Sequence, residues 1–202
     1  MKEMRWAIWV AASGALWAQP VELHFGPATG ASLTLTVEKT GLWSGRKHVF
    51  EFPRYTAKAI FNDREPSESS VELSIDAADA VCHDAWVSDK DREKVLEYMR
   101  RDMLDVERHP QLLFRSERVT ATGAGEFELQ GRLSVRGVAK PVVVTAKVES
   151  RNGVVSAVSG TAVVKMKDYG LTPPKAALGA IGTKNEMTVS FRLIPAAATH
   201  SN

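Results

Sequence analysis

The sequence lacks cysteine pairs, an excess of one charge and internal membrane spans. Cys82 is the only cysteine in 202 residues, so no internal disulfide can form. Its thiol is interpreted as buried and unreactive, or else as free to react or to pair between chains. Lysine and arginine (26) nearly balance aspartate and glutamate (24), and the basic residues are scattered, which argues against nucleic-acid binding. Beyond the N-terminal region, no segment is long and apolar enough to span a bilayer.

Motifs for catalysis and for metal binding are also missing. The sequence contains no P-loop, no dinucleotide fingerprint, no nucleophile elbow and no histidine pattern such as H-E-x-x-H. Cys82-His83-Asp84 groups three types of metal ligand, but adjacent residues of a strand point to opposite faces. A strand end followed by a polar turn is the simpler interpretation. The sequence therefore predicts no metal, no cofactor and no catalytic residue, although a site assembled from distant residues stays open.

The N-terminal region has the composition of a secretory signal peptide. Two basic residues begin it, residues 6–18 carry no charge, and the small residue Ala18 precedes Gln19. A basic start, a short apolar run and a small residue at the exit are the three parts of a cleavable signal. We expect a signal peptide over residues 1–18 and one domain over residues 19–202, in the periplasm or secreted.

The dominant pattern of the remaining chain has a period of two. Apolar and polar residues alternate over residues 33–38, 71–76 and 187–193, which gives each stretch one apolar and one wet face. Antiparallel sheets with one buried face show this alternation. Less regular strand candidates lie at residues 21–25, 48–61, 112–120, 126–135, 141–149 and 154–167. Many short strands without alternating helices predict an all-β barrel or sandwich.

Glycine and asparagine mark the expected connections in this pattern. Gly123-Ala124-Gly125 and Arg151-Asn152-Gly153 are predicted hairpin turns, because Gly and Asn tolerate a positive φ. Gly131 interrupts a strand and indicates a bulge or bend there.

One segment has helical periodicity instead. Between Ser88 and about Val106, apolar residues recur at the spacing of one helix face, among them Met99 and Met103. Ser88 is the expected cap, and Pro110 prevents any continuation. The pattern predicts one amphipathic helix whose apolar stripe packs on the barrel or across one end, either as core or as a lid over a ligand.

Three further segments occur in the order found in a known family. Residues 109–116 (HPQLLFRS) are similar to an aromatic-Pro-x-Ile-x-Phe-x-Ser stretch. Residues 131–142 (GRLSVRGVAKPV) resemble a Gly-x-Leu-Thr-hydrophobic-x-Gly strand and turn that leads into a Pro-Val strand. Residues 167–171 (KDYGL) resemble an Asp-aromatic-Gly-hydrophobic element. Together they resemble the YceI-like family over most of the mature chain.

The resemblance implies an eight-stranded, lipocalin-like antiparallel barrel with a helix near one end. It also implies an elongated apolar tunnel for a polyisoprenoid or similar amphiphile, usually in the periplasm. Two segments depart from the family pattern. Residues 101–106 lack the His and the aromatic pair that often follow Arg-Asp after the helix. Residues 165–167 (KMK) stand where an Arg commonly precedes the Asp-aromatic-Gly element, and Lys cannot reproduce a bidentate Arg contact.

An eight-stranded barrel is just wide enough to be filled by side chains or to hold one slender ligand. We expect a carrier or storage protein, not an enzyme, for a lipid, an isoprenoid or a quinone-like molecule. A filled structural or interaction barrel and an enzyme acting on an amphiphile are the alternatives. Transient membrane contact and a dimer stay open. The expected ligand-binding wall consists of Leu35, Phe52, Leu73, Phe114, Phe127, Leu129, Val144, Val189 and Phe191.

Overall fold

The computed structural model describes residues 20–196, so the expected signal peptide lies outside the described residues. The strands are β1 (Val21–Phe25), β2 (Ser32–Gly41), β3 (Lys47–Glu51), β4 (Tyr55–Phe61), β5 (Ser70–Asp76), β6 (Val81–Cys82), β7 (Gln111–Gly123), β8 (Glu126–Val135), β9 (Val138–Arg151), β10 (Val154–Lys165), β11 (Lys175–Ala176) and β12 (Ile181–Leu193). The helices are α1 (Asp89–Tyr98), the π-helix η2 (Met99–Leu104) and the short 3₁₀ turns η1 (Pro66–Glu68), η3 (Met166–Tyr169) and η4 (Ala177–Gly179).

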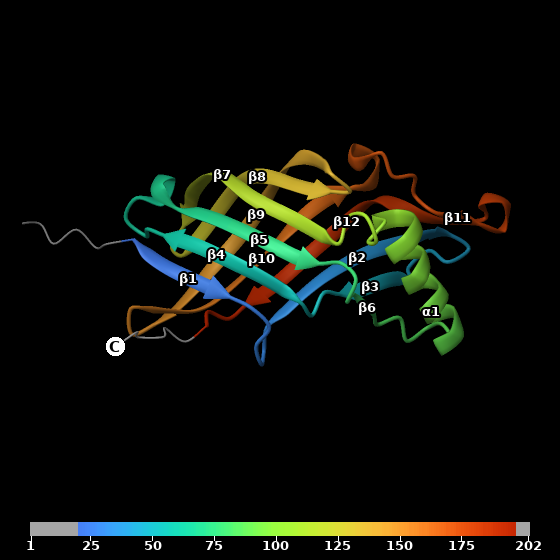
Figure 1. Ribbon diagram of the computed structural model, residues 1–202, viewed down its shortest axis with the longest axis horizontal. Coiled ribbons are helices and arrows are strands. Elements are labelled where there is room, and N and C mark those ends of the chain that lie inside the picture. Colours follow the sequence, from blue (N-terminus) through green and yellow to red (C-terminus); the bar gives the residue numbers. More distant parts are fainter. Residues whose placement is uncertain (1–19, 197–202) are drawn as a thin grey trace, which may run out of the picture.

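All strands belong to one antiparallel sheet that curls around a common interior (Figure 1). Their order is β1-β4-β5-β7-β8-β9-β10-β12-β2-β3-β6, and β11 pairs with β12. The curl brings β1 back toward the residues that follow β12, where Phe25 forms an isolated bridge with Pro195. The predicted all-β fold with one principal helix is confirmed.

The family resemblance implied eight strands, but the sheet contains twelve within residues 20–196. The apolar pattern also gives too few strands, because it does not register the shortest ones and merges others. The stretch expected as one strand at residues 48–61 is divided into β3 and β4 around Pro53, which has no N–H to donate to a ladder. β6 and β11 are two residues long, too short for any alternation to be visible.

The period-two pattern places the apolar side chains inside the curl. On β4 the burial alternates strictly, with Tyr55, Ala57 and Ala59 buried between exposed neighbours. Ladder pairing requires that facing residues share a side of the sheet, so these positions align with the inward residues of the next strands. The core is therefore one cluster that draws on nearly every strand and on the helix.

Turns occur where glycine and asparagine predicted them. Asn152 and Gly153 connect β9 to β10, and both have a positive φ, 52° and 78°. Gly125 closes the turn between β7 and β8 with φ 70°. The irregularity expected at Gly131 lies on the facing strand, where the register between β7 and β8 shifts after the Ser116–Gly131 pair.

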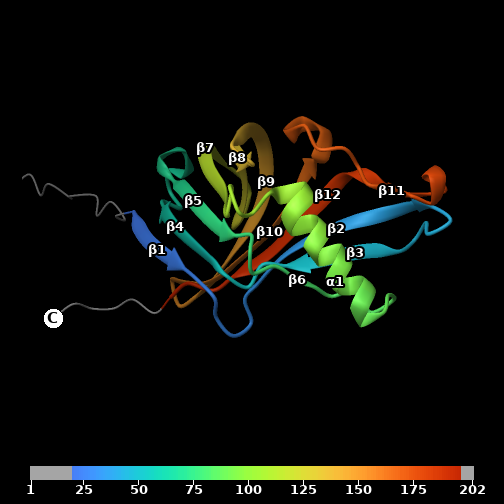
Figure 2. The ribbon, with the colours of Figure 1, turned by 45° about the vertical axis from the view of Figure 1, so that its right-hand side comes forward.

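The predicted helix lies across one end of the curled sheet, beside β2, β3 and β6 (Figures 1 and 2). Ser88 caps α1, because its hydroxyl accepts a hydrogen bond from the Asp91 N–H at 3.2 Å. α1 continues directly into η2, and Asp105 ends the segment in the left-handed conformation with φ 50°. Met99 and Leu104 are buried against the sheet, as expected for an apolar stripe.

Replacing Gly131 tests how closely the wall is packed around it. A Cβ there would lie 2.4 Å from the carbonyl oxygen of Arg115 and 2.7 Å from the ring of Phe114. We expect Gly131→Ala to lower the free energy of unfolding by about 1–3 kcal/mol in a urea titration, since the backbone must shift. Gly26→Ala is the control, because its Cβ meets nothing nearer than 3.9 Å. Equal stability of the two variants would contradict this packing.

Candidate functional site

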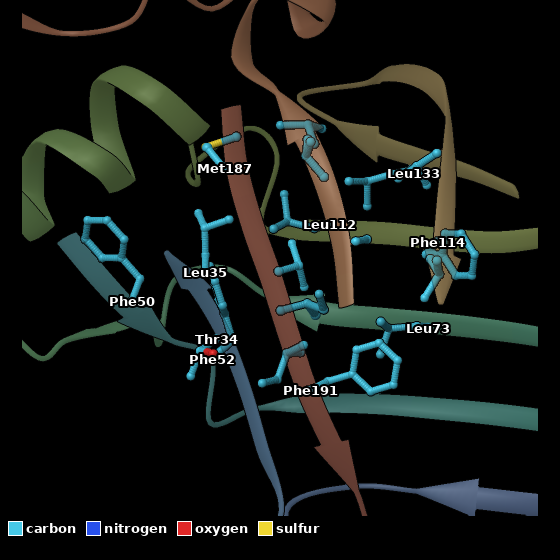
Figure 3. A pocket seen from close by; sticks show the side chains of 18 of the residues that line it. Thr34, Leu35, Phe50, Phe52, Leu73, Leu112, Phe114, Leu133, Met187 and Phe191 are labelled. Atoms are coloured by element: carbon cyan, nitrogen blue, oxygen red, sulfur yellow. The ribbon is translucent and has the colours of Figure 1, made fainter. Parts of the chain in front are cut away.

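The curled sheet encloses a cavity of about 450 Å³ whose lining is almost entirely apolar. This volume lies within the range of roughly 300–1,000 Å³ that small-molecule sites occupy. Figure 3 shows Leu35, Leu73, Phe114 and Phe191, which come from four different strands, arranged around the same space. The interior is thus hollow, which the amino-acid pattern alone left open.

All nine residues expected to form the wall line this cavity. They are Leu35, Phe52, Leu73, Phe114, Phe127, Leu129, Val144, Val189 and Phe191. The side chains that were predicted to point inward do point into the cavity. Their contact with a ligand stays a proposal.

Strand register joins several of these residues into one transverse row. Leu35 on β2 faces Phe50 on β3 and Val189 on β12. From there the row continues through Ala162 and Val144 to Leu129 on β8. Each link is a pair of directly opposed residues, whose Cβ atoms lie about 4.5–5.5 Å apart in an antiparallel ladder. The row forms an apolar hoop across six neighbouring strands, from β3 to β8.

Small residues within the wall account for the empty space. Ala57, Ala59, Ala146 and Ala162 occupy inward positions on β4, β9 and β10 and line the cavity. An alanine projects a single methyl group where leucine or phenylalanine would fill the centre. Because these positions lie on several strands, the missing volumes join into one cavity rather than scattered voids.

The helix completes the cavity at one end. Val95, Met99, Met103 and Leu104 line it together with the strands. The methionine stripe is therefore both packed core and a wall of the cavity. Methionine is unbranched and polarisable, so it can repack around differently shaped neighbours.

The polar part of the lining includes Lys39, His48 and Thr183, beside Thr34, Ser69 and Lys94, and the sequence analysis selected none of them. Lys39 and His48 are buried, and Thr183 is half-buried. Lys39 Nζ donates a hydrogen bond to Thr183 Oγ1 at 3.1 Å. The signal was present in the sequence, since Lys39 continues the inward series of Leu33, Leu35 and Val37 at the same period of two.

Comparison with known proteins decides the family. The profile of the YceI-like domain matches residues 27–194, which is most of the chain. The chain belongs to the YceI-like family. Two proteins named UPF0312 are among its relatives. The one from Ectopseudomonas mendocina is 29% identical over 126 residues, 60% of this chain and 62% of the relative. The one from Pseudomonas aeruginosa is 28% identical over 144 residues, 69% of this chain and 70% of the relative.

Solved structures share the fold at low sequence identity. BcnA from Burkholderia cenocepacia superposes with a TM-score of 0.64 and 17% identity, over 82% of this chain and 96% of that one. A polyisoprenoid binding domain from Saccharophagus degradans superposes with a TM-score of 0.56 and 12% identity, over 86% of this chain and 97% of that one.

The sequence alignment with the Ectopseudomonas relative spans under two thirds of that protein's own length.

The two departures from the YceI-like pattern both fall on the cavity. Met166 stands in the segment where an Arg is common in the family, and it is buried and lines the cavity. In the segment without the family His, Met103 and Leu104 line the cavity as well. Both departures thus extend the apolar part of the wall.

Asp84 is a fully buried carboxylate that holds the imidazole of His48. The ring nitrogen Nδ1 of His48 and the N–H of Val49 both bond to the Asp84 carboxylate, the latter at 2.9 Å. Burial alone raises the pKa of Asp84, but these hydrogen bonds outweigh it and the pKa lies below its usual value. Asp84 therefore stays ionised and fixes the orientation of His48. The Trp86 ring lies beside the imidazole, tilted by 38°, with 5.2 Å between the ring centroids.

The neighbouring residues of Asp84 behave as alternation predicts. Cys82 is buried, and burial raises the pKa of its thiol to about 11. His83 points outward and pairs with Glu51 at 2.6 Å. Within residues 20–196, no group of three His, Cys, Asp or Glu side chains could hold a metal ion. In the same part of the chain, no helix is both long and apolar enough to cross a membrane.

The Asp84–His48 pair predicts a dependence of stability on acid. In the unfolded chain the Asp84 carboxyl has a pKa near its ordinary 3.8, and in the native state the value is lower. Its stabilising contribution is therefore complete above that value and is lost as the pH falls through the native pKa. We expect Asp84→Asn to lower the free energy of unfolding at pH 7 by about 1–3 kcal/mol, and to reduce its loss below about pH 4.

Urea titrations across the acid range measure both effects. Asp91→Asn is the control, because Asp91 forms an exposed ion pair with Lys94. Solvent and salt screen such a pair, so its removal has little effect at either pH. If Asp84→Asn leaves the acid dependence unchanged, Asp84 does not carry it.

Proposed function

We propose that this YceI-like protein binds a long, largely apolar amphiphile inside the cavity and serves as its carrier or store. The ligand class is a polyisoprenoid, a quinone-like molecule or a fatty lipid. The single observation that carries the proposal is the apolar cavity of about 450 Å³ inside the curled sheet. The domain from Saccharophagus degradans with the same fold is described as polyisoprenoid binding, which supports this ligand class.

The physical chemistry favours occupancy by an apolar chain. Water in such a space finds few hydrogen-bonding partners, because the wall offers methyl, methylene and aromatic groups. A hydrocarbon chain gains about 25 cal/mol for each Å² of apolar surface that it removes from water. Several of the wall side chains are phenylalanines, which contribute large contact areas to a slender ligand.

The cavity weighs against a filled structural barrel. Protein interiors pack at a density of roughly 0.74–0.76 and leave few voids larger than a water molecule. A single space of about 450 Å³ is well above the roughly 150 Å³ of engineered cavities that stay dry or bind benzene. An unused void of this size lowers stability, so its retention fits a role in binding.

We also propose that the protein acts in the cell envelope after removal of residues 1–18. The basic start, the uncharged run and Ala18 support cleavage before Gln19. Protein from the periplasmic fraction is expected to begin at Gln19 when its N-terminal peptide is identified by mass spectrometry. An intact Met1 on protein that only detergent releases contradicts export and favours an N-terminal anchor.

Leu129→Trp tests the cavity directly. Leu129 is buried on β8 and lies in the apolar hoop opposite Val144. An indole there projects into the ligand's path, while the cavity accommodates the added volume. We expect lipid recovered by solvent extraction after reconstitution to fall severalfold, with the thermal midpoint of delipidated protein nearly unchanged.

Gln130→Trp is the matched control, because the next residue of β8 is exposed on the outer face. It should change neither quantity. The midpoint is measured on delipidated protein, since loss of a ligand alone lowers apparent stability. A drop of about 1–3 kcal/mol in the stability of delipidated Leu129→Trp, without any lipid in the parent protein, contradicts a hollow carrier and indicates a filled core.

A further inference from the structure

Lys39 is a buried cation at the polar end of an apolar cavity. On β2 the inward positions are Leu33, Leu35, Val37 and Lys39, so the fourth side chain of an apolar series carries a charge. Only 8% of Lys39 is exposed. Lysine is almost never buried to this degree unless it is paired.

The immediate partners of Lys39 leave its charge without an ion pair. Thr183 accepts one hydrogen bond at 3.1 Å, and the Trp43 ring lies 5.8 Å from the ammonium. Within residues 20–196, no carboxylate lies at ion-pair distance from Lys39 Nζ. Asp84 contributes at longer range, but its oxygens are already bonded to His48 and to the N–H of Val49.

Burial accordingly lowers the pKa of Lys39, and the negative charge of Asp84 opposes this only in part. An ammonium group has three donors, of which Thr183 takes one. The Thr183 hydroxyl, while accepting from Lys39, can donate its own hydrogen. The Lys39 ammonium and the Thr183 hydroxyl can therefore both donate to a ligand at this end of the cavity. The positive charge of Lys39 has no ion-pair partner there.

Strand register places Lys39 and Thr183 further along the cavity than the apolar hoop. Val37 faces His48 on one side and Met187 on the other, and the next inward pair along the same strands is Lys39–Thr183. The apolar hoop through Leu35 lies one inward position beyond Val37. A chain lying along β2 thus passes the inward side chains of Leu33, Leu35 and Val37 before it reaches Lys39.

We propose that Lys39 and Thr183 bind the anionic head group of the amphiphile, a carboxylate or a phosphate monoester. The inference rests on the proposed function, because it assigns a chemical class to the ligand of the same cavity. The ammonium and the Thr183 hydroxyl donate to the anionic oxygens, and His48, oriented by Asp84, forms the adjoining wall. The hydrocarbon tail lies along the hoop. A neutral head group satisfies the donors but leaves the lysine charge uncompensated.

The test compares lipids that differ only in charge. Delipidated mature protein is titrated with hexadecanoic acid, with hexadecyl phosphate and with methyl hexadecanoate, and binding is followed by native mass spectrometry. We expect at least one of the two anions to bind about tenfold or more tightly than the ester, because charge-assisted hydrogen bonds are stronger than neutral ones. Which anion binds tighter identifies the head group.

Lys39→Met removes the charge while keeping an unbranched side chain of similar length. It should abolish the preference for the anions and leave binding of the ester unchanged or tighter. Lys184→Met is the matched control, because Lys184 adjoins Thr183 on β12 but is exposed, lies outside the cavity lining and pairs with Glu38 at 2.5 Å. It should retain the full preference.

The outcomes separate this inference from the function on which it rests. Equal binding of acid, phosphate and ester by the parent protein overturns the head-group site and leaves the carrier function standing. Failure to bind all three overturns both. If the Lys39→Met variant still binds the anions more tightly than the ester, other residues bind the anion, and the proposed site at Lys39 is overturned. If Lys39→Met does not fold, as judged by its thermal midpoint, the parent comparison still decides, and Lys39→Gln replaces the variant.

Discussion

A sheet that curls around its own apolar face has no second layer to pack against, so its side chains alone decide how much of the interior is filled. Here the inward positions of β4, β9 and β10 include several alanines among leucine, valine and phenylalanine side chains. The small side chains leave the centre unfilled, and one cavity results. The apolar wall and the proposed ligand class both follow from this composition of the inward face.

The two ends of the cavity differ in chemistry, and this gives it a direction. α1 and η2 contribute methionines and leucine beside β2 and β3, where Lys39, His48 and Thr183 also line the space. At the other end, Phe61 and Phe127 meet edge to face at 5.5 Å, and Ser69, whose hydroxyl bonds to Asn62, is the neighbouring polar residue of the lining. An amphiphile in such a site has one favoured orientation, because burying its polar head among phenylalanines leaves that head without partners.

The all-β fold and the wall residues of the cavity could be predicted from the amino-acid sequence. Alternation has a period of two wherever one face is buried, so Leu35, Val189 and Phe191 could be placed on the wall without knowing their neighbours. Strand number could not be obtained this way, because β6 and β11 are too short to alternate and Pro53 divides a stretch that looked continuous. Whether the interior is hollow depends on the sizes of inward side chains from strands far apart in the sequence, such as Ala57 on β4 and Ala162 on β10, which line the same cavity. Lys39 was missed because the alternation was followed only over residues 33–38, although the next inward position of the same period is residue 39.

The burial of Cys82 determines how the protein responds to disulfides and oxidants. A thiol whose pKa is about 11 is almost entirely protonated at neutral pH, and the thiolate is the species that reacts with disulfides and oxidants. With no second cysteine in the sequence, the native fold is indifferent to the redox state of its compartment. The same property makes the molecule convenient to label, since a cysteine introduced on the surface reacts while Cys82 stays silent.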